Sequence, residues 1–275
     1  MIHIGTAGWS YDDWKGRVYP ARPPRGFDAL TFIASLFTCV EINSTFYRPC
    51  PAAMADGWVR KVADRKRFAF TVKLWEKFTH GDEPWSDAEL RDVQEGITPL
   101  LVSGRLGALL LQFPWNFADS PAARDRIRRI AGAFTGWAPL VIEVRHKSWL
   151  EPGAFEFLKA QQLCFANIDQ PKSSTSIQGT SHVTGRVAYL RLHGRNAKAW
   201  FSREATRDEK YDYLYSQAEL EPFASAAKAM EPQAEALFVI TNNHFQGKAV
   251  VNAIQLRKMI EGLDVPVPEG LRGES

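Results

Sequence analysis

Charged side chains that could carry acid–base or anion chemistry recur near the ends of short apolar segments in this chain. They are Glu41 in CVEIN, Lys73 in FAFTVK, Glu143 and Arg145 in VIEVR, Asp169 in FANID, and Arg191 and His193 in YLRLH. Two carboxylates such as Glu41 and Glu143 can act as a general acid and a general base, with His193 as a third candidate catalytic residue. Lysine and arginine can bind a phosphate or a carboxylate, because a guanidinium fork matches either group with two hydrogen bonds.

The segments that carry these residues are expected to be strands. Eight short runs are apolar and often rich in β-branched or aromatic residues, which is typical of strands covered on both faces. They span residues 2–6, 39–43, 68–73, 107–113, 139–144, 163–169, 187–193 and 237–241.

Helix patterns fill most of the gaps between these runs. Apolar residues recur at helical spacing within 27–37, 127–134 and 220–230, and Ser86 with Glu89 has the form of a capping box at a helix start. Alternation of strands and helices predicts a parallel sheet, and eight repeats predict a closed one. The GxGxxG motif usual in open doubly wound sheets follows none of the strands. The sequence therefore predicts a somewhat irregular (β/α)8 TIM-type barrel, formed by one domain over residues 1–275.

Two connections depart from this regular alternation. Residues 170–186 follow the sixth strand and are rich in Ser, Thr and Gly, so we expect a long loop there instead of a helix. Residues 194–215 form a polar, aromatic-bearing insertion after the seventh strand. Connections of this length in a compact domain are usually functional or mobile.

The alternation of side chains along each strand predicts where the charges point. Side chains alternate between the two faces of a strand, and in a barrel the outward face packs on helices. The apolar set Val40, Ile42, Val72, Ile142, Val144 and Leu192 is expected under the helices, so the opposite set of Glu41, Lys73, Glu143, Arg145, Asp169, Arg191 and His193 should point into the lumen near its C-terminal end. Barrel enzymes keep their sites at that end. The alternative is a salt-bridge network that only fills the lumen.

Composition narrows the class of protein. The chain has 45% hydrophobic residues and a net charge of +3, which is too mild to indicate nucleic-acid binding by itself. Its three cysteines are far apart and form no CxxC pair, so neither disulfides nor a thiolate zinc site are expected. The first residues do not read as a signal peptide, and the apolar run 106–113 is too short to cross a bilayer. We expect a cytoplasmic protein with no membrane partner.

Several motifs, in order along nearly the whole chain, resemble the YecE-like family, also called domain of unknown function 72. The matching segments are IGTAGWSYDDWKG (4–16), VYP (18–20), VEINSTFYR (40–48), FAFTVK (68–73) with TH (79–80), LGALLLQFP (106–114), IEVRHKSW (142–149), YLRLHGR (189–195) and NNHFQGKAVVNA (242–253). The resemblance implies a barrel and a cytoplasmic bacterial or archaeal protein, without a defined reaction. That barrel is similar to those of metal-dependent abasic-site endonucleases and sugar isomerases, an analogy of fold alone. The segment DQPKSSTS after the sixth strand departs from the family pattern.

The leading hypothesis is an enzyme, a hydrolase or lyase, that acts on a phosphorylated or nucleotide-like anion at the C-terminal barrel mouth. Glu41, Glu143 and His193 are the candidate catalytic residues. Both glutamates are expected to lie deep and, if unpaired, to have raised pKa values, with the guanidinium groups of Arg145 and Arg195 nearer solvent. The candidate ligand-binding residues are Trp9, Tyr11, Asn43, Lys73, Gln112, Arg145, Trp149, Asp169, Arg191, Arg195 and Asn243.

Two other hypotheses remain open at this point. One is a non-catalytic module that binds nucleic acid at the mouth, and the other is a metal-dependent phosphodiesterase or sugar isomerase. Glu41, Glu143, Asp169 and His193 could together hold a divalent metal. Their spacing matches no recognised ligand motif and the mouth lacks a cluster of histidines, so we expect no tightly bound metal, and the cofactor is unknown.

Overall fold

Eight parallel strands close into a barrel in chain order. The computed structural model describes residues 1–81, 83–177 and 179–273. The strands are β1 (Ile2–Ala7), β2 (Cys39–Ile42), β3 (Ala69–Lys73), β4 (Leu106–Gln112), β5 (Leu140–Glu143), β6 (Cys164–Asp169), β7 (Val187–Leu192) and β8 (Ala236–Thr241). Each strand pairs with its sequence neighbours, and β8 pairs with β1 to complete the ring. The predicted (β/α)8 architecture is confirmed. The two ends of each predicted strand lie within two residues of the ends of the observed strand.

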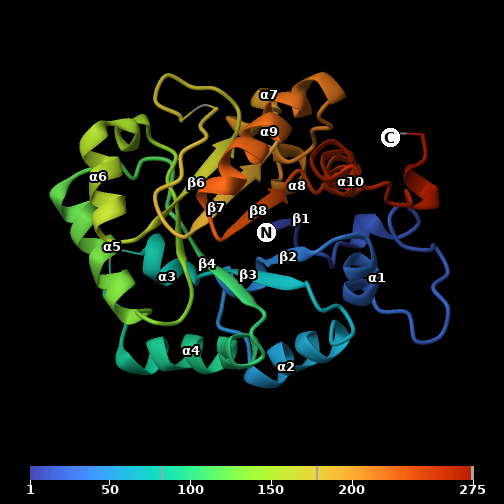
Figure 1. Cartoon of the computed structure of the whole chain (residues 1–275), viewed down its shortest axis with the longest axis horizontal. Helices are drawn as coiled ribbons and strands as arrows, with labels where there is room; N and C mark the ends of the chain where they lie inside the picture. The colour runs from blue at the N-terminus through green and yellow to red at the C-terminus, as the bar shows by residue number, and fades with distance from the viewer. Residues whose placement is uncertain (82, 178, 274–275) are drawn as a thin grey trace.

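Helices surround the barrel on its outside (Figure 1). The α-helices of the described residues are α1 (Ala29–Leu36), α2 (Ala52–Lys61), α3 (Glu76–Thr79), α4 (Asp87–Val102), α5 (Pro121–Ala133), α6 (Pro152–Ala160), α7 (Ala197–Trp200), α8 (Arg207–Lys210), α9 (Gln217–Met230) and α10 (Lys248–Glu261). The capping box predicted at the start of α4 is present, because Ser86 accepts from the Glu89 amide and the Glu89 carboxylate accepts from the Ser86 amide. Among the described residues, no helix is long and apolar enough to span a bilayer.

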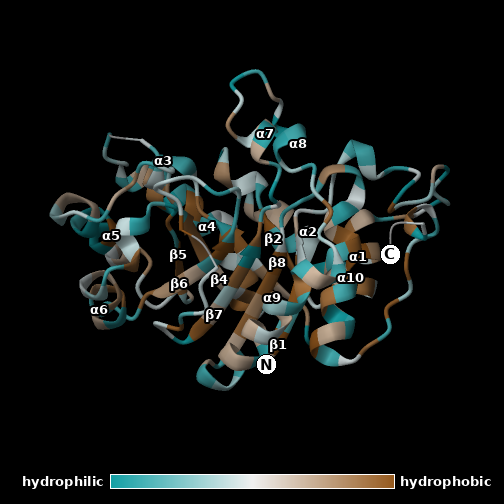
Figure 2. Ribbon diagram, turned by 90° about the horizontal axis from the view of Figure 1, so that it is seen from above, coloured by the Kyte–Doolittle hydropathy of each residue, from teal (hydrophilic) through white to brown (hydrophobic). Residues whose placement is uncertain are grey.

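The two predicted irregular connections lie where expected. The part of residues 170–186 that the structure describes contains neither helix nor strand, and the insertion 194–215 contains only the short helices α7 and α8. Figure 2 shows α7 and α8 projecting from the end of the barrel opposite the N-terminus. Because β1 starts near that N-terminus and all strands are parallel, α7 and α8 lie over the C-terminal mouth.

The pairing of β3 with β4 is irregular. The register between these strands shifts at Phe70/Thr71, opposite Gly107. A Cβ atom on Gly107 would lie 2.4 Å from the ring of Phe238, so the bulge needs a residue without a side chain. Below the charged layer, the ring of Phe238 stacks on His3 at 4.8 Å and lies 6.0 Å from the ring of Tyr189. Aromatic packing therefore closes the lower barrel.

Strand register tests the predicted direction of each side chain, since paired residues in a parallel sheet face the same side. Glu41 pairs with Thr71, whose hydroxyl contacts the Tyr189 hydroxyl across the lumen. The strands β2, β3, β5 and β7 confirm the predicted faces. In β6, however, Ile168 pairs with Arg191 and Asp169 pairs with Leu192. Ile168 thus faces the lumen and Asp169 faces the helices, so the prediction for Asp169 was wrong.

Candidate active site at the barrel mouth

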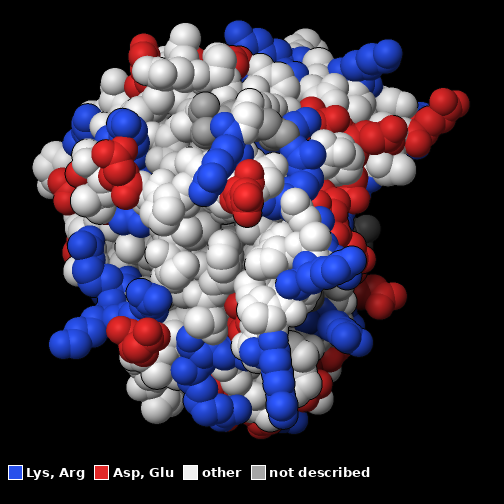
Figure 3. Space-filling view, turned by 90° about the vertical axis from the view of Figure 1, so that its right-hand side faces the viewer, with Lys and Arg blue, Asp and Glu red and all other residues white. Residues whose placement is uncertain are grey.

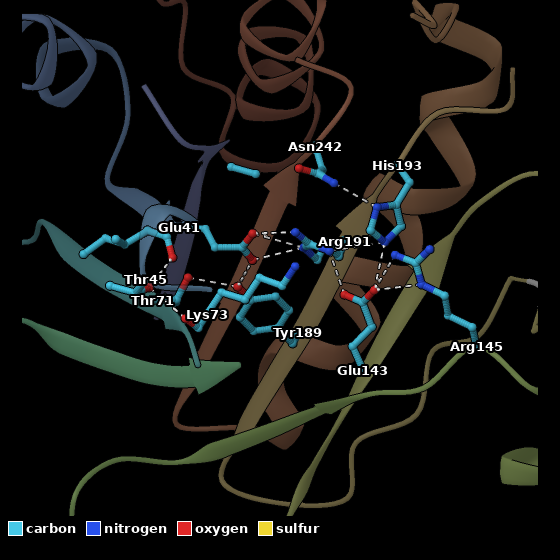
Figure 4. Close-up of polar contacts among 12 residues, drawn as sticks. Glu41, Thr45, Thr71, Lys73, Glu143, Arg145, Tyr189, Arg191, His193 and Asn242 are labelled. Carbon is cyan, nitrogen blue, oxygen red and sulfur yellow. Dashed lines mark hydrogen bonds and ion pairs between the residues drawn. The ribbon is translucent and has the colours of Figure 1, made fainter. Parts of the chain in front are cut away.

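Arg191 lies at the centre of the charged layer and is bound by two glutamates (Figure 4). Its Nη2 lies 2.6 Å from Oε1 of Glu41, and its Nε lies 3.0 Å from Oε2 of the same carboxylate. On the other side, its Nη1 donates to Oε2 of Glu143 at 2.8 Å. Both glutamates are fully buried and Arg191 is 2% exposed. A buried guanidinium is therefore matched by carboxylates from β2 and β5.

Glu143 has two further partners besides Arg191. Nη2 of Arg145 donates to its Oε1 at 3.0 Å, and Nε2 of His193 lies 3.2 Å from the same oxygen. Burial alone would raise the pKa of Glu143, but the positive charge of Arg191, helped by His193 and Arg145, holds that pKa well below its usual range. A raised pKa was expected only for an unpaired carboxyl, and Glu143 is paired with Arg191, Arg145 and His193, so that expectation does not apply to it.

His193 and Tyr189 complete the hydrogen bonding of the layer. Nδ2 of Asn242 lies 2.9 Å from Nδ1 of His193, and burial lowers the pKa of His193 to about 3 despite the nearby charge of Glu143. The Tyr189 hydroxyl donates to Oε2 of Glu41 at 2.8 Å. Each of these groups has a defined partner, so the deep layer is an internal charge network as well as the floor of the mouth.

Lys73 belongs to the same layer, but its amine pairs with no carboxylate among the described residues. Its Nζ instead lies 3.5 Å from the centre of the Phe46 ring. Oγ1 of Thr45 donates to the backbone oxygen of Lys73 at 2.7 Å, which ties the loop carrying Phe46 to the end of β3. Burial, helped by the charge of Arg191, lowers the pKa of Lys73 to about 7.

A cavity of about 290 Å³ opens above this layer. Six of the predicted ligand-binding residues line it: Trp9, Tyr11, Asn43, Lys73, Gln112 and Arg191. The remaining lining residues were not predicted, and they are Gly8, Ser10, Ser44, Tyr47, Arg207, Tyr211, Asn242 and His244. The mouth is thus built from the loops after β1, β2, β7 and β8, with β3 and β4 below.

The insertion after β7 reaches across this cavity. The Arg207 side chain, at the start of α8, hydrogen-bonds the hydroxyl of Tyr47 from the loop after β2. His244 lies beneath, 3% exposed, with its ring stacked on Tyr11 at 4.5 Å. Burial and the charge of Arg207 lower the pKa of His244 to about 4, so its imidazole is neutral at pH 7. Its buried Nδ1 has no hydrogen-bond partner among the described residues.

A second cavity of about 760 Å³ adjoins the first, and the two share Gln112 and Tyr211. Arg145 lines this second cavity, with its guanidinium 5.3 Å from the centre of the Trp200 ring. Arg145 is therefore not a lining residue of the smaller cavity, although it belongs to the same charge network through Glu143.

Four predicted ligand-binding residues lie away from both cavities. Asp169 and Arg195 pair with each other on the helix side of the barrel, where Tyr215 donates to Asp169 at 2.6 Å. Asn243 hydrogen-bonds the Tyr213 backbone oxygen and Asn252. Trp149 is fully buried and donates to the backbone of Phe117 at 2.9 Å. Arg195 is thus not a free guanidinium at the mouth, since Asp169 and Glu219 both bind it.

The carboxylates of the mouth do not form a metal cluster in the described ranges. No group of three or more His, Cys, Asp or Glu side chains in them is arranged to hold a metal ion. Glu41 and Glu143 both bind Arg191, and Asp169 lies on the other side of the sheet.

Comparison with known proteins gives a family match over nearly the whole chain. The family model described as "Protein of unknown function DUF72" matches residues 3–271. The chain belongs to the DUF72 family. Its matched range includes the eight strands, except the first residue of β1, and every loop of the mouth, so the cavity lies within the DUF72 domain.

Relatives and solved structures agree with this assignment. The chain is 30% identical to the UPF0759 protein YunF of Bacillus subtilis (strain 168), over 96% of this chain and 95% of YunF. It is 28% identical to the UPF0759 protein YecE of Escherichia coli (strain K12), over 57% of this chain and 53% of YecE. The crystal structure of a DUF72 family protein from Thermotoga maritima MSB8 has a TM-score of 0.81 and 31% identity, covering 95% of this chain and 99% of that one. Another, from Enterococcus faecalis V583, has a TM-score of 0.83 and 25% identity, covering 97% of each chain.

Proposed function

We propose that this DUF72 protein is an enzyme that binds a small anionic substrate in the cavity at its barrel mouth. The observation that carries the proposal is the charge of the cavity lining. Lys73, Arg191 and Arg207 line it, and no Asp or Glu stands among the described lining residues. A carboxylate or a phosphate entering the cavity would meet cations and neutral hydrogen-bonding groups only.

The pairing beneath the cavity leaves a positive charge at its surface. Glu41 and Glu143 together carry two negative charges, and Arg191 and Arg145 balance them within one network. Lys73 remains outside that balance, and Arg207 forms its ion pair with the neighbouring Asp208. Arg207 is 58% exposed and its ion pair to the neighbouring Asp208 is 3.4 Å long, so it can turn toward an entering anion at little cost.

The size and lining of the cavity favour a small molecule. Its volume of about 290 Å³ lies at the lower end of ordinary ligand pockets. Asn43, Gln112 and Asn242 supply amides for orientation, and Trp9 and Tyr11 supply aromatic walls. On the side of the barrel that Figure 3 shows, basic side chains lie among acidic ones.

The geometry gives the deep acids a different role from the predicted one. Glu41 and Glu143 hold Arg191 in place and keep it charged, so we assign them to positioning, and His193 bridges Glu143 to Asn242. The groups nearest to a bound ligand would be Lys73, Asn242 and His244. Any chemistry is therefore expected at the upper layer, above the charge network.

Isothermal titration with phosphate, sulfate and acetate tests this proposal, with glycerol as the uncharged comparison. Arg207→Ala should weaken anion binding about ten-fold, which corresponds to about 1.4 kcal/mol. Arg128→Ala is the matched control, because Arg128 is also an exposed helical arginine paired with a nearby aspartate, Asp125. Absence of anion binding, or an equal effect of the two substitutions, would contradict the proposal.

A further inference from the structure

The Lys73 amine is held in the mouth cavity without a carboxylate partner among the described residues. Glu41 is occupied by Arg191 and Tyr189, and Glu143 is occupied by Arg191, Arg145 and His193. Figure 4 shows the Lys73 side chain extending toward this cluster from β3. The Phe46 ring, 3.5 Å from Nζ, positions the amine without neutralising it.

The surroundings of Lys73 also favour its neutral form. Burial and the positive charges of Arg191 and Arg145 act against the ammonium, while Glu143 and Glu41 act in its favour, and the resulting pKa is about 7. A lysine that is desolvated or lies beside another cation is an effective nucleophile toward carbonyl groups. At neutral pH about half of the Lys73 side chains would carry a free amine, compared with about 0.1% or less for an ordinary lysine.

We propose that Lys73 is the catalytic nucleophile, forming an imine with the carbonyl carbon of a small aldehyde or ketone that also carries a carboxylate or a phosphate. This rests on the proposed function, because the cationic lining must first bind the anionic group. The amine lone pair attacks the carbonyl carbon, a C–N bond forms, and the carbonyl oxygen becomes a hydroxyl. That oxygen then leaves as water with the two amine hydrogens, so no oxidant or reductant is needed.

The cavity places suitable groups around such a substrate. Arg207 stands at the cavity rim to receive the anionic group, and Lys73 stands on the floor beside Gln112 and Arg191. His244 is neutral and buried, and its Nδ1 has no partner among the described residues, so it can accept or donate a hydrogen bond to a substrate hydroxyl. The anion and the carbonyl would thus be held at opposite ends of one small cavity.

Reductive trapping tests the imine directly. The full chain is incubated with cyanoborohydride and pyruvate, glyceraldehyde 3-phosphate or propanal, and modified lysines are located by peptide mass mapping. We expect labelling of Lys73 by an anionic carbonyl to exceed labelling of the exposed Lys66 at least about ten-fold at pH 7, because far more of its amine is free. The carboxylated and phosphorylated probes show which anion the site prefers. Labelling should rise as the pH is raised through about 7, and Lys73→Met and Lys73→Arg should abolish it at this site.

The outcomes separate this inference from the function on which it rests. If phosphate binds by titration but neither anionic carbonyl labels Lys73 faster than Lys66, the imine is excluded and the anion site stands. If phosphate does not bind and Lys73 is not labelled, both proposals fail. Equal labelling by propanal would overturn the anionic substrate class. Because labelling is mapped in the unsubstituted chain, the result does not depend on whether the Lys73 variants fold.

Discussion

Arg191 binds Glu41 through two atoms at once, with Nη2 at 2.6 Å from one carboxylate oxygen and Nε at 3.0 Å from the other. The pair joins β7 to β2 across the barrel lumen, and both side chains are excluded from solvent. Replacing both members of a buried ion pair by apolar residues often changes stability little. Removing only one member is strongly destabilising, because the other charge then stays buried without a partner. The pair therefore makes the barrel sensitive to substitution at a buried position on the floor of the mouth cavity.

Glu41→Gln should lower the free energy of unfolding by about 3–5 kcal/mol, because it leaves Arg191 with an unmatched charge on that side. Urea denaturation of both chains measures the difference. Asp125→Asn is the control, since Asp125 is 68% exposed and its pair with Arg128 is a surface one. That control should change stability by less than about 0.5 kcal/mol. A small effect of Glu41→Gln would show that Arg191 is compensated by Glu143 alone.

Asp169→Asn should destabilise the chain without changing anion affinity. Asp169 accepts from Arg195 and Tyr215, and the Tyr215 hydroxyl in turn accepts from the Gly194 amide at the start of the insertion after β7. Weakening hydrogen bonds to this charged, buried carboxylate should cost about 2 kcal/mol. Thermal unfolding and phosphate titration on the same preparation separate the two effects. A large loss of phosphate affinity at unchanged stability would return Asp169 to the binding site.

Stability should fall as the pH is lowered below about 6.5, because buried histidines resist protonation in the folded chain. Burial lowers the pKa of His193 to about 3 and that of His244 to about 4, both from an ordinary value of 6.5. The unfolded chain takes up these protons first, so each histidine should remove about 1.4 kcal/mol of stability per pH unit within its window. The pKa of Glu143 is lowered in the folded chain. Glu143 therefore adds to the loss of stability only when the pH falls below about 4.5, its ordinary pKa.

Urea denaturation at several pH values between 7 and 5 checks this dependence. His193→Gln should reduce the slope of the free energy of unfolding against pH by the contribution of about one proton. The substitution is also expected to lower stability at pH 7, since Asn242 and Glu143 lose a partner, and so the slope is the quantity to compare. A slope identical to that of the unsubstituted chain would mean that His193 is not the neutral buried group.

The sequence was sufficient to predict the barrel and most of its charged lumen. Strand length and apolar content located β1 to β8, and the alternation of Glu41, Lys73, Glu143 and Arg191 against apolar neighbours gave the lumen face. The rule failed at β6, because it assumes that polar side chains find no partners outside the barrel. Asp169 finds Arg195 and Tyr215 there, both supplied by the long insertion after β7.

The outer part of the cavity could not be predicted in the same way. Tyr47, Arg207 and Tyr211 lie on loops, where side-chain direction follows no strand periodicity. Asn242 could have been predicted from the alternation of side chains along β8. Ile240 pairs with Arg191 and faces the lumen, and Asn242 is the next inward position. Choosing Asn243 in its place was an error of one residue, which moves a side chain to the opposite face.

Anomalous diffraction from crystals soaked in selenate tests the central claim most directly, since selenate is a tetrahedral anion close to phosphate and sulfate. We expect the strongest selenium peak inside the mouth cavity, within hydrogen-bond distance of Arg207, which lines it. Soaks of Arg207→Ala crystals should show that peak weakened, with surface sites unchanged. A cavity without a selenium peak, in crystals where selenate occupies other positions, would contradict the assignment of the barrel mouth as an anion site.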